Sequence, residues 1–481
     1  MTWPTQTGGN SYDSGNSITS LSDGSSIVTG SFEGTASFGG ITLASAGSYD
    51  AFVAKLNADG SFAWATKAGG NSYCAGYGIT SLSDGSSIVT GNFSETASFG
   101  DTTLTSAGND DVFIAKLNAE GEYQWATKAG GNSYDDGFSI TSLSDGSSIV
   151  TGSFYGTASF GDITLASAGS YDAFVAKLNA DGEYQWATKA GGTSVDYSAG
   201  ITSLSDGSSI VTGSFSETAS FGDTTLTSAG GYDAFVAKLN ADGSFAWATK
   251  GGGNSDVNGR SITSLSDGSS IVTGGGTASF GDTTLTSAGG SDAFIAKLNA
   301  DGSYAWATKA GGTNWDGGVD ITSLSDGSSI VTGNFYGTAS FGDTTLTSAG
   351  ESDAFIAKLN ADGSHAWATQ AGGTNWDGGF GITSLIDGSS IVSGAFNETA
   401  SFGDTTLTSA GSYDAFIAKL NPNGSWDITP PAAPSSPDLS AATESGNSNS
   451  DNLTNDTTPT FRGTAEANSS VELFAGSTSI G

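Results

Sequence analysis

The chain has 481 residues, too many for one ordinary compact core, so its length favours several domains or a tandem-repeat architecture. Its 49 acidic and 14 basic residues give a formal net charge of −35, which excludes nucleic acid and anionic lipid as electrostatic partners. Although 73 residues are glycine, the 36 % hydrophobic and 10 % aromatic content indicates a packed interior rather than a disordered chain.

Disulfides, membrane spans and export signals are also absent from the sequence pattern. Cys74 is the single cysteine, so no intrachain disulfide is possible. No apolar run approaches the roughly 18 residues of a membrane helix, and we therefore expect no membrane insertion. The opening residues, MTWPTQTGG, have neither a charged region nor an apolar region of the kind found in a signal peptide, and none is expected there.

One sequence unit recurs along the chain, and its Asp-Gly turn serves as a ruler. Successive turns are 61 residues apart, except for a step of 59 between the fifth and sixth copies, where TGGGTASF replaces the longer TGSFSETASF. The turns begin at Asp23, Asp84, Asp145, Asp206, Asp267, Asp326 and Asp387.

Each unit predicts four β-strands, which the second unit shows in chain order. Residues 79–83 form a strand that ends at the hairpin turn Asp84-Gly85, and residues 88–93 form the second strand. The segment 94–109, which contains TASFGDTTLTSAG, is expected to be a long loop with a small extra hairpin. Residues 112–117 and 123–128 form the third and fourth strands on either side of the turn AEGE, and no 3.6-residue apolar period indicates a helix.

Four antiparallel strands per unit, repeated in tandem, predict an all-β fold: a seven-bladed β-propeller of four-stranded blades spanning residues 1–426. Stacked blades bury both faces of each sheet, which accounts for a third strand that is apolar on both sides, as in 51–56. The opening WPTQTGG matches WATKAGG at residues 64–70, so the N-terminal strand is expected to complete the seventh blade and close the ring. A solenoid is the alternative, but it needs shorter coils and polar caps.

DAFVAKLNADGSFAWATKAGG at residues 50–70, followed in each unit by a segment such as GITSLSDGSSIVTG, resembles the bacterial seven-bladed β-propeller (SBBP) repeat. The resemblance implies an exported or surface protein and supplies no catalytic residues. After a Pro-rich linker at residues 427–437, the segment 438–481 contains NDTTPTFRGTAEANSSVELF and resembles the opening of a bacterial Ig-like adhesin domain. We expect this segment to be an incomplete Ig-like domain, because a sandwich needs about seven strands.

Two columns of lysine recur in the units. We interpret them as structural, each lysine pairing with an aspartate of its blade, and the alternative is an anion-binding ring. The first column is Lys55, Lys116, Lys177, Lys238, Lys297, Lys358 and Lys419; the second is Lys67, Lys128, Lys189, Lys250 and Lys309, with Gln370 in the sixth place.

Oxygen-rich glycine loops offer a weak calcium site, and a structural role in turns is the alternative. The aspartate column concerned is interrupted by Cys74 and Val257. No other cofactor is expected. The calcium candidates are Asp13, Asp135, Asp196, Asp316 and Asp377.

Catalysis finds little support in the sequence. His365 is the only histidine and occupies a position that is Phe or Tyr in other units, so we interpret it as a substituted aromatic residue rather than a general base. Near-identical blades place the same groups around an axis, whereas an active site needs unlike groups at one point. The innermost strands are expected to carry no ionisable side chain before the turn.

The crossing from the fourth strand to the next first strand varies most between units. Its aromatic residues are candidates for stacking on sugar rings or anchoring a protein partner, and the alternative is packing between blades. They are Tyr12, Tyr73, Tyr134, Trp315 and Trp376.

These features predict a monomeric, non-catalytic binding or scaffold module of a secreted or cell-surface bacterial protein, related to adhesion, whose partner is a cell-surface glycan or protein. Lectin-like carbohydrate binding through the aromatic loops is the first alternative, and a propeller hydrolase or lyase is the second.

Overall fold

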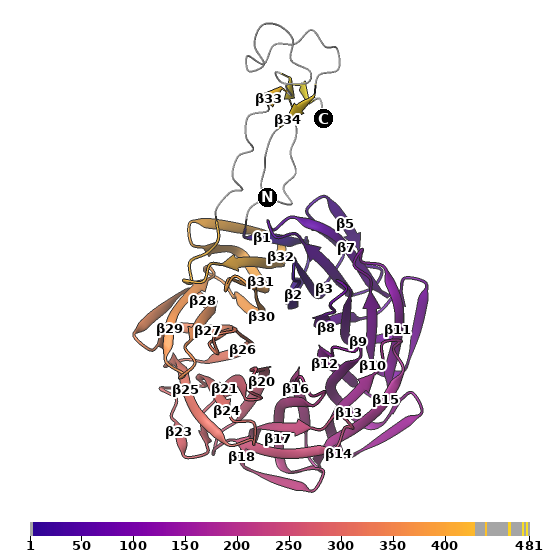
Figure 1. Ribbon diagram of the computed structural model, residues 1–481, viewed down its shortest axis with the longest axis vertical. Helices are drawn as coiled ribbons and strands as arrows, with labels where there is room; N and C mark the ends of the chain where they lie inside the picture. The colour runs from indigo at the N-terminus through magenta and orange to yellow at the C-terminus, as the bar shows by residue number, and fades with distance from the viewer. Residues whose placement is uncertain (1–2, 429–437, 440–459, 463–473, 476–477, 480–481) are drawn as a thin grey trace.

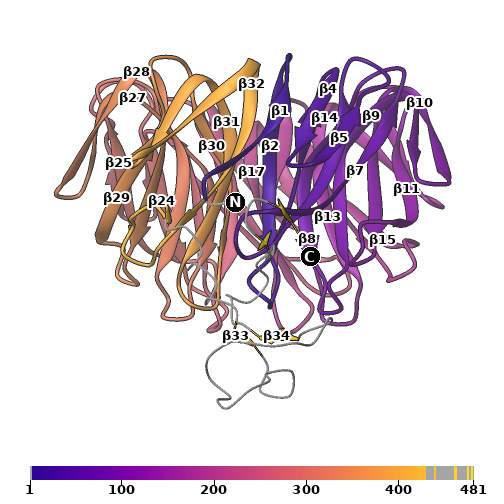
Figure 2. The ribbon, with the colours of Figure 1, turned by 90° about the horizontal axis from the view of Figure 1, so that it is seen from above.

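The computed structural model describes residues 3–428, 438–439, 460–462, 474–475 and 478–479, and among these the chain forms β-strands and no helix. Figure 1 shows the strands arranged around a central axis, and Figure 2 shows the same ring turned by 90°. The all-β propeller prediction is therefore confirmed.

The strands form successive groups in which each strand is antiparallel to the next, as β8, β9, β10 and β11 show. The strands nearest the axis are β2 (Asp13–Ser20), β8 (Cys74–Ser81), β12 (Asp135–Ser142), β16 (Asp196–Ser203), β20 (Val257–Ser264), β26 (Asp316–Ser323) and β30 (Gly378–Ser384). The second strands are β3 (Ser26–Phe32), β9 (Ser87–Phe99), β13 (Ser148–Phe160), β17 (Ser209–Phe221), β21 (Ser270–Gly276), β27 (Ser329–Phe341) and β31 (Ser390–Phe402).

The third strands are β6 (Asp50–Leu56), β10 (Thr102–Leu117), β14 (Ile163–Leu178), β18 (Thr224–Leu239), β24 (Ala293–Leu298), β28 (Thr344–Leu359) and β32 (Thr405–Leu420). The outer strands are β7 (Phe62–Gly70), β11 (Tyr123–Gly131), β15 (Tyr184–Gly192), β19 (Phe245–Gly251), β25 (Tyr304–Gly312), β29 (His365–Ala371) and β1 (Thr5–Gly9). Short hairpins add β4 (Thr35–Phe38), β5 (Ile41–Ala44), β22 (Ala278–Phe280) and β23 (Thr283–Leu285).

The two ends of the ring meet at β1, which pairs antiparallel with β32 and places Thr5 opposite Ile417. Trp3 is buried and its indole Nε1 donates a hydrogen bond to the Ala58 carbonyl at 3.3 Å, so the first residues link the last group to the first. Near the axis, a threonine hydroxyl of each group donates to a serine of the next, from Thr19 Oγ1 to Ser81 Oγ at 3.2 Å onward. The remaining links run from Thr80, Thr141, Thr202, Thr263 and Thr322, and Thr383 donates to Ser20.

The second and third strands are longer than predicted. β9 continues to Phe99 and β10 begins at Thr102, so the segment expected to be a loop with a small hairpin is a continuation of both strands. Its tip pairs with the outer strand of the preceding group, where Gly70 lies opposite Ala97. A Cβ on Gly70 would lie 1.9 Å from the Thr96 carbonyl oxygen, so this close approach requires glycine.

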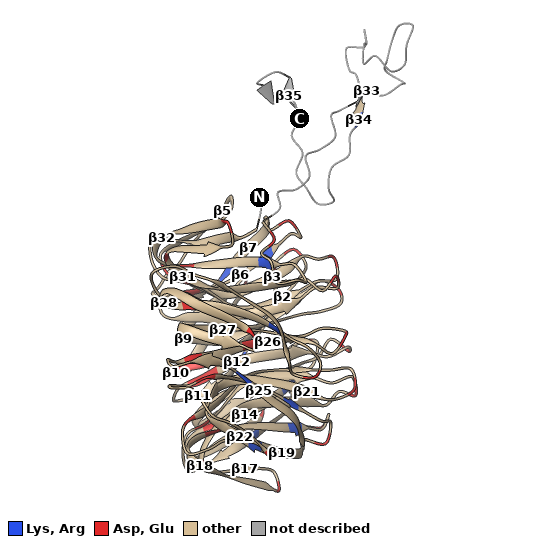
Figure 3. Ribbon diagram, turned by 90° about the vertical axis from the view of Figure 1, so that its left-hand side faces the viewer, with Lys and Arg blue, Asp and Glu red and all other residues tan. Residues whose placement is uncertain are grey.

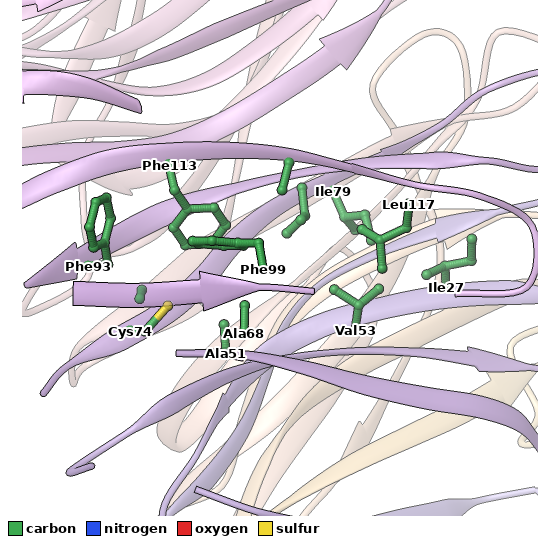
Figure 4. Close-up of a cluster of buried hydrophobic side chains, with 13 residues drawn as sticks. Ile27, Ala51, Val53, Ala68, Cys74, Ile79, Phe93, Phe99, Phe113 and Leu117 are labelled. Atoms are coloured by element: carbon green, nitrogen blue, oxygen red, sulfur yellow. The ribbon is translucent and has the colours of Figure 1, made fainter. Parts of the chain in front are cut away.

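The hydrophobic core lies between neighbouring groups. The cluster of Figure 4 combines Val53 of one group with Phe93, Phe99 and Phe113 of the next, and its member Cys74 is fully buried. The third strands are buried on both faces, as their consecutive apolar residues predicted. Each interface therefore depends on residues from two groups.

Ion pairs repeat at the outer strands, but only one lysine column makes most of them. Lys67 Nζ lies 2.6 Å from Asp50 Oδ2, and the same pairing occurs in four further groups. In the other column, an ion pair is found for Lys419, whose Nζ is 3.6 Å from Asp427. The interpretation that each lysine pairs with an aspartate of its group thus fits the outer-strand column. For the third-strand column it was wrong in the region that the structure describes.

The C-terminal segment is described at four short strands, β33 (Asp438–Leu439), β34 (Phe461–Arg462), β35 (Phe474–Ala475) and β36 (Thr478–Ser479). β33 pairs with β34 and β35 with β36. The predicted linker at 427–437 lies almost wholly outside the described residues, as does most of 438–481. Nothing in the described part of the chain is a helix long and apolar enough to cross a bilayer.

Candidate functional site

One face of the ring carries the segments that connect an outer strand to the next inner strand; we call it the crossing face. There the Cys74 backbone N–H donates to the Tyr49 carbonyl at 2.9 Å. This hydrogen bond holds the crossing beside the residues that precede β6 of the neighbouring group. The Asp-Gly turns lie at the other ends of the same strands. The predicted aromatic column therefore belongs to the crossing face.

Eight aromatic side chains of this face form a continuous series of contacts, the aromatic arc, that spans four neighbouring groups. The ring centroids of Tyr12 and Tyr413 lie 5.1 Å apart, and those of Tyr49 and Tyr73 lie 5.9 Å apart. The series continues from Tyr73 to Tyr77 through a hydrogen bond between their hydroxyls. In order, the arc comprises Phe380, Trp376, Tyr413, Tyr12, Tyr49, Tyr73, Tyr77 and Phe138.

The five predicted aromatic residues divide into two sets. Tyr12, Tyr73 and Trp376 lie in the aromatic arc. Tyr12 and Tyr73 pack against a tyrosine of the preceding group, and Trp376 packs against Tyr413 of its own group. Tyr134 and Trp315 are 48 % and 47 % exposed and stand apart from it, with Trp315 packed edge-on against Tyr336. Burial raises the pKa of the Tyr12 and Tyr73 phenols, so both stay neutral hydrogen-bonding groups.

A cavity of about 480 Å³ opens on the axis beside the aromatic arc. Each inner strand contributes one residue to it at an equivalent position, and we call this set the axial ring. These residues differ from group to group, whereas the serines, threonines and isoleucines further along the same strands repeat. The axial ring is Asn16, Tyr77, Phe138, Ala199, Arg260, Val319 and Phe380.

The prediction that inner strands carry no ionisable side chain before the turn was wrong. Arg260 lies in β20 and Asp320 in β26, and both line the axial cavity. The inner strands begin earlier than predicted, at Cys74 rather than residue 79 in the second group, so part of the variable crossing is strand. The appearance of Arg and Asp in the variable segments GRS and GVD was the available signal.

The two charged residues of the cavity have different surroundings. Asp320 accepts hydrogen bonds from Ser261 Oγ and from the backbone N–H groups of Ile321 and Ile382, at 2.9 and 2.8 Å for the last two. It thus joins three inner strands, and burial raises its pKa. Arg260 is exposed to the cavity and makes no ion pair within the described ranges.

The calcium candidates are buried acceptors of backbone hydrogen bonds. Asp135 accepts from the N–H groups of Gly131 at 2.7 Å and Tyr155 at 3.3 Å, and the other members have equivalent bonds. Burial is the main cause that raises the pKa to about 7 for Asp13, Asp135 and Asp377 and to about 6 for Asp196 and Asp316. Among residues that the structure describes, no group of three or more Asp, Glu, His or Cys side chains is placed to hold a metal ion. The calcium site stays a prediction.

His365 and Cys74 lie in different parts of the ring. His365 packs edge-on against Phe341 in the position that Phe62 and Tyr123 occupy in their groups, and burial lowers its pKa. Cys74 is fully buried, and burial raises the pKa of its thiol to about 12. Neither residue lines the axial cavity.

Family models match two parts of the chain. A β-propeller domain of unknown function (DUF5122) matches residues 402–427, and a bacterial Ig-like domain matches residues 431–481. The regulatory protein FlaEY of Caulobacter vibrioides is 27 % identical over 346 residues, which are 65 % of this chain and 35 % of that protein. The chain thus spans about a third of this relative's length.

The chain is also similar, at low identity, to solved structures. The WD40 β-propeller domain of Doa1 is 13 % identical with a TM-score of 0.42, covering 86 % of this chain and 97 % of its own. A puromycin hydrolase mutant in complex with PGG is 12 % identical with a TM-score of 0.43, covering 86 % and 53 %. The family models identify a β-propeller region followed by a bacterial Ig-like region.

Proposed function

We propose that this chain is a monomeric, non-catalytic binding or scaffold module of a secreted or surface-exposed bacterial protein, and that it serves adhesion. Its ring is a seven-bladed propeller of four-stranded blades of the SBBP type. The observation that carries the proposal is the concentration of unlike residues on the crossing face, where the aromatic arc, the axial cavity and two exposed aromatic side chains lie. The matched Ig-like region supports a surface location, since such domains resemble those of adhesins.

The partner in this proposal is a cell-surface glycan or protein that contacts the crossing face. Exposed Trp and Tyr side chains are well suited to such contacts, because they bury large rigid surfaces at little cost in conformational entropy. Trp315 lies in a shallow hollow with Asn314, Tyr336 and Glu351, which combines an aromatic face with polar groups. Lectin-like binding is the second form of this function, and the axial cavity favours it.

A hydrolase or lyase has less support. Arg260 and Asp320 are the charged residues that line the axial cavity, and Asp320 is held by three hydrogen bonds. A general acid–base pair needs two titratable groups within reach of one reacting bond, and an arginine stays protonated.

Attachment of beads that carry the whole chain to a mucin-coated surface tests the proposal. A Trp315→Ala/Tyr134→Ala double variant is expected to reduce attachment by about tenfold or more, as loss of interface aromatic residues does. Ile386→Ser is the matched control, because Ile386 is fully exposed on the turn Leu385–Asp387 at the opposite end of its strand. Equal attachment of all three proteins would contradict the proposal.

A further inference from the structure

The axial cavity is the place where the ring departs most from its own repeat. Below it, the threonine–serine hydrogen bonds pass from group to group around the axis. At the axial ring, the equivalent positions carry an amide, a phenol, two phenyl rings, a guanidinium and two small aliphatic groups. Its volume of about 480 Å³ lies within the range of small-molecule sites, roughly 300–1,000 Å³.

The charge in this cavity that has no partner is positive. Asp320 uses both carboxylate oxygens to join neighbouring strands, so its charge is committed to the fold. Arg260 has no carboxylate within ion-pair distance in the part of the chain that the structure describes. Its neighbours in the axial ring are the small residues Ala199 and Val319, which leave room for a ligand beside the guanidinium. A planar guanidinium in this setting is suited to bind a carboxylate through two parallel hydrogen bonds.

The remainder of the lining is both aromatic and hydroxyl-rich. Tyr77 and Phe138 lie with ring centroids 6.1 Å apart, and Phe380 lines the same cavity. Ser139 faces the same space, as do Asn16, whose amide N–H donates to the Gly76 carbonyl, and Ser261, whose hydroxyl donates to Asp320. The oxygens of Asn16 and Ser261 can still accept hydrogen bonds from a ligand. A sugar matches such a lining, because its ring presents apolar C–H faces and its edge presents hydroxyl groups. A flat apolar ligand would use neither the Ser139 hydroxyl nor the Arg260 guanidinium.

We propose that the axial cavity binds a carboxylate-bearing sugar, of the uronic or sialic acid class, with Arg260 as the residue that binds its carboxylate. The sugar ring lies against Tyr77 and Phe138, and its hydroxyl groups bond the Ser139 hydroxyl and donate to the side-chain oxygens of Asn16 and Ser261. This proposal rests on the lectin-like form of the proposed function and names its ligand class. Acidic residues outnumber basic ones by 49 to 14, and the view in Figure 3 shows both kinds interspersed over the ring, so an anion in the cavity needs the local attraction that Arg260 supplies.

Calorimetry and saturation-transfer NMR on the whole chain test the proposal with four probes. The acidic probes are the methyl glycosides of glucuronic acid and N-acetylneuraminic acid, and methyl glucoside is the neutral probe. A short peptide with a free C-terminal carboxylate and an aromatic last residue is the fourth. We expect the acidic sugars to bind, the neutral sugar to bind at least tenfold more weakly, and the peptide not to bind.

Three variants locate the binding. Arg260→Gln should weaken binding of the acidic sugars by about 10- to 100-fold and change the neutral sugar less than twofold. Arg462→Gln removes the same charge from β34 and should change neither, and Ala199→Trp should abolish binding by filling the cavity beside Arg260. Arg260 is exposed and has no ion pair with any residue that the structure describes, so the melting temperature of Arg260→Gln should match that of the parent protein. A matching melting temperature excludes misfolding as the cause of weaker binding.

Binding of acidic sugars that Arg260→Gln leaves unchanged, or an equal loss for acidic and neutral sugars, would overturn the proposal. Binding of the peptide without the sugars would overturn it in favour of a C-terminal carboxylate ligand. If no probe binds while bead attachment still depends on Trp315 and Tyr134, the sugar site falls and the adhesion function stands. Loss of both responses would remove the two together.

Discussion

Gln370 occupies a position at which five other outer strands place a lysine against a buried aspartate, and exchanging it for lysine tests what that ion pair does for stability. Asp353 is fully buried and receives the Gln370 side-chain amide at 3.1 Å. With this neutral partner, burial raises the pKa of Asp353 to about 6. In the lysine-bearing groups the Nζ–Oδ2 distance is 2.6–2.7 Å.

The size of the effect follows from the difference between the folded and unfolded pKa values of Asp353. An unfolded aspartate has a pKa of about 3.9, so the shift of about two units corresponds to about 3 kcal/mol. A raised folded pKa gives stability that is present below pH ~4 and lost as the pH rises through about 6. At pH 8 the buried carboxylate therefore lowers the free energy of unfolding, and a lysine partner should recover part of that loss.

The expected gain for Gln370→Lys is about 1–2 kcal/mol at pH 8 and near zero at pH 4. The figure is below the full shift because the paired lysines are about a third exposed, 33–35 % at the side chain, and solvent screens their charge. For a ring of this size, 1 kcal/mol changes the melting temperature by roughly 1 °C. Differential scanning calorimetry of variant and parent at both pH values measures the difference.

Lys309→Gln provides the reverse exchange in the neighbouring group. It removes the partner of Asp292, which lies 2.7 Å away and is almost fully buried, and should lower the melting temperature at pH 8 by a similar amount. Equal differences at pH 4 and pH 8 would refute the reasoning, because the effect would then not depend on ionisation of the aspartate. A loss of stability in Gln370→Lys at pH 8 would refute it as well.

Three further predictions concern single residues of the ring. Because Cys74 is fully buried and its thiol pKa is raised to about 12, it should react with Ellman's reagent at pH 8 only after denaturation in guanidinium chloride, and rapid labelling of the native protein would contradict its burial. Glu95 has a φ of 58° where an equivalent position holds Gly156, so Glu95→Gly should raise stability by about 0.5–1 kcal/mol in calorimetry, and Gly156→Glu should lower it. Trp3→Ala should cost about 3–5 kcal/mol, since it removes a 4 %-exposed indole from the junction of the two chain ends, and an unchanged melting temperature would show that this junction does not hold the ring closed.

The repeat was sufficient to predict the all-β propeller because strand and turn chemistry is local. An Asp-Gly turn between two apolar runs predicts a hairpin in any unit, and the constant period places equivalent hairpins in succession. The outer lysine–aspartate pairs were likewise accessible, since a buried carboxylate in a repeated position needs a repeated partner. Which of two lysine columns supplies that partner depends on the register between the third and outer strands, which composition does not determine.

The long hairpins and the start of the inner strands were harder to predict for a related reason. TASFGDTTLTSAG is polar and glycine-rich, as expected for a loop, yet its strands pair with a neighbouring group and become stable through a contact far from their own unit. The inner strands extend into the variable crossing because their first residues pair with the second strand of their own group, and backbone pairing tolerates almost any side chain. The variable segments that contain Arg260 and Asp320 were therefore not predicted to be strand, and the cavity that these residues line was missed.

A ring of repeated groups can still hold one asymmetric binding site. The residues that stabilise the ring and the residues that line the site occupy different positions along the same strands. The buried phenylalanines, the glycines of the hairpin contacts and the threonine–serine bonds join neighbouring groups, so a change there affects an interface. The side chains of the axial ring line the cavity instead. Among them Asn16 donates to the Gly76 carbonyl of the next group, and Asp320, one step further along its strand, is bonded to both neighbours. Substitutions in the axial ring should consequently change ligand binding with little effect on folding, whereas equivalent substitutions one level lower should do the reverse. The symmetry of the sheets thus argues against catalysis only at strand positions where the same side chain repeats in each group. It does not exclude a specific binding site on the axis, where the side chains differ.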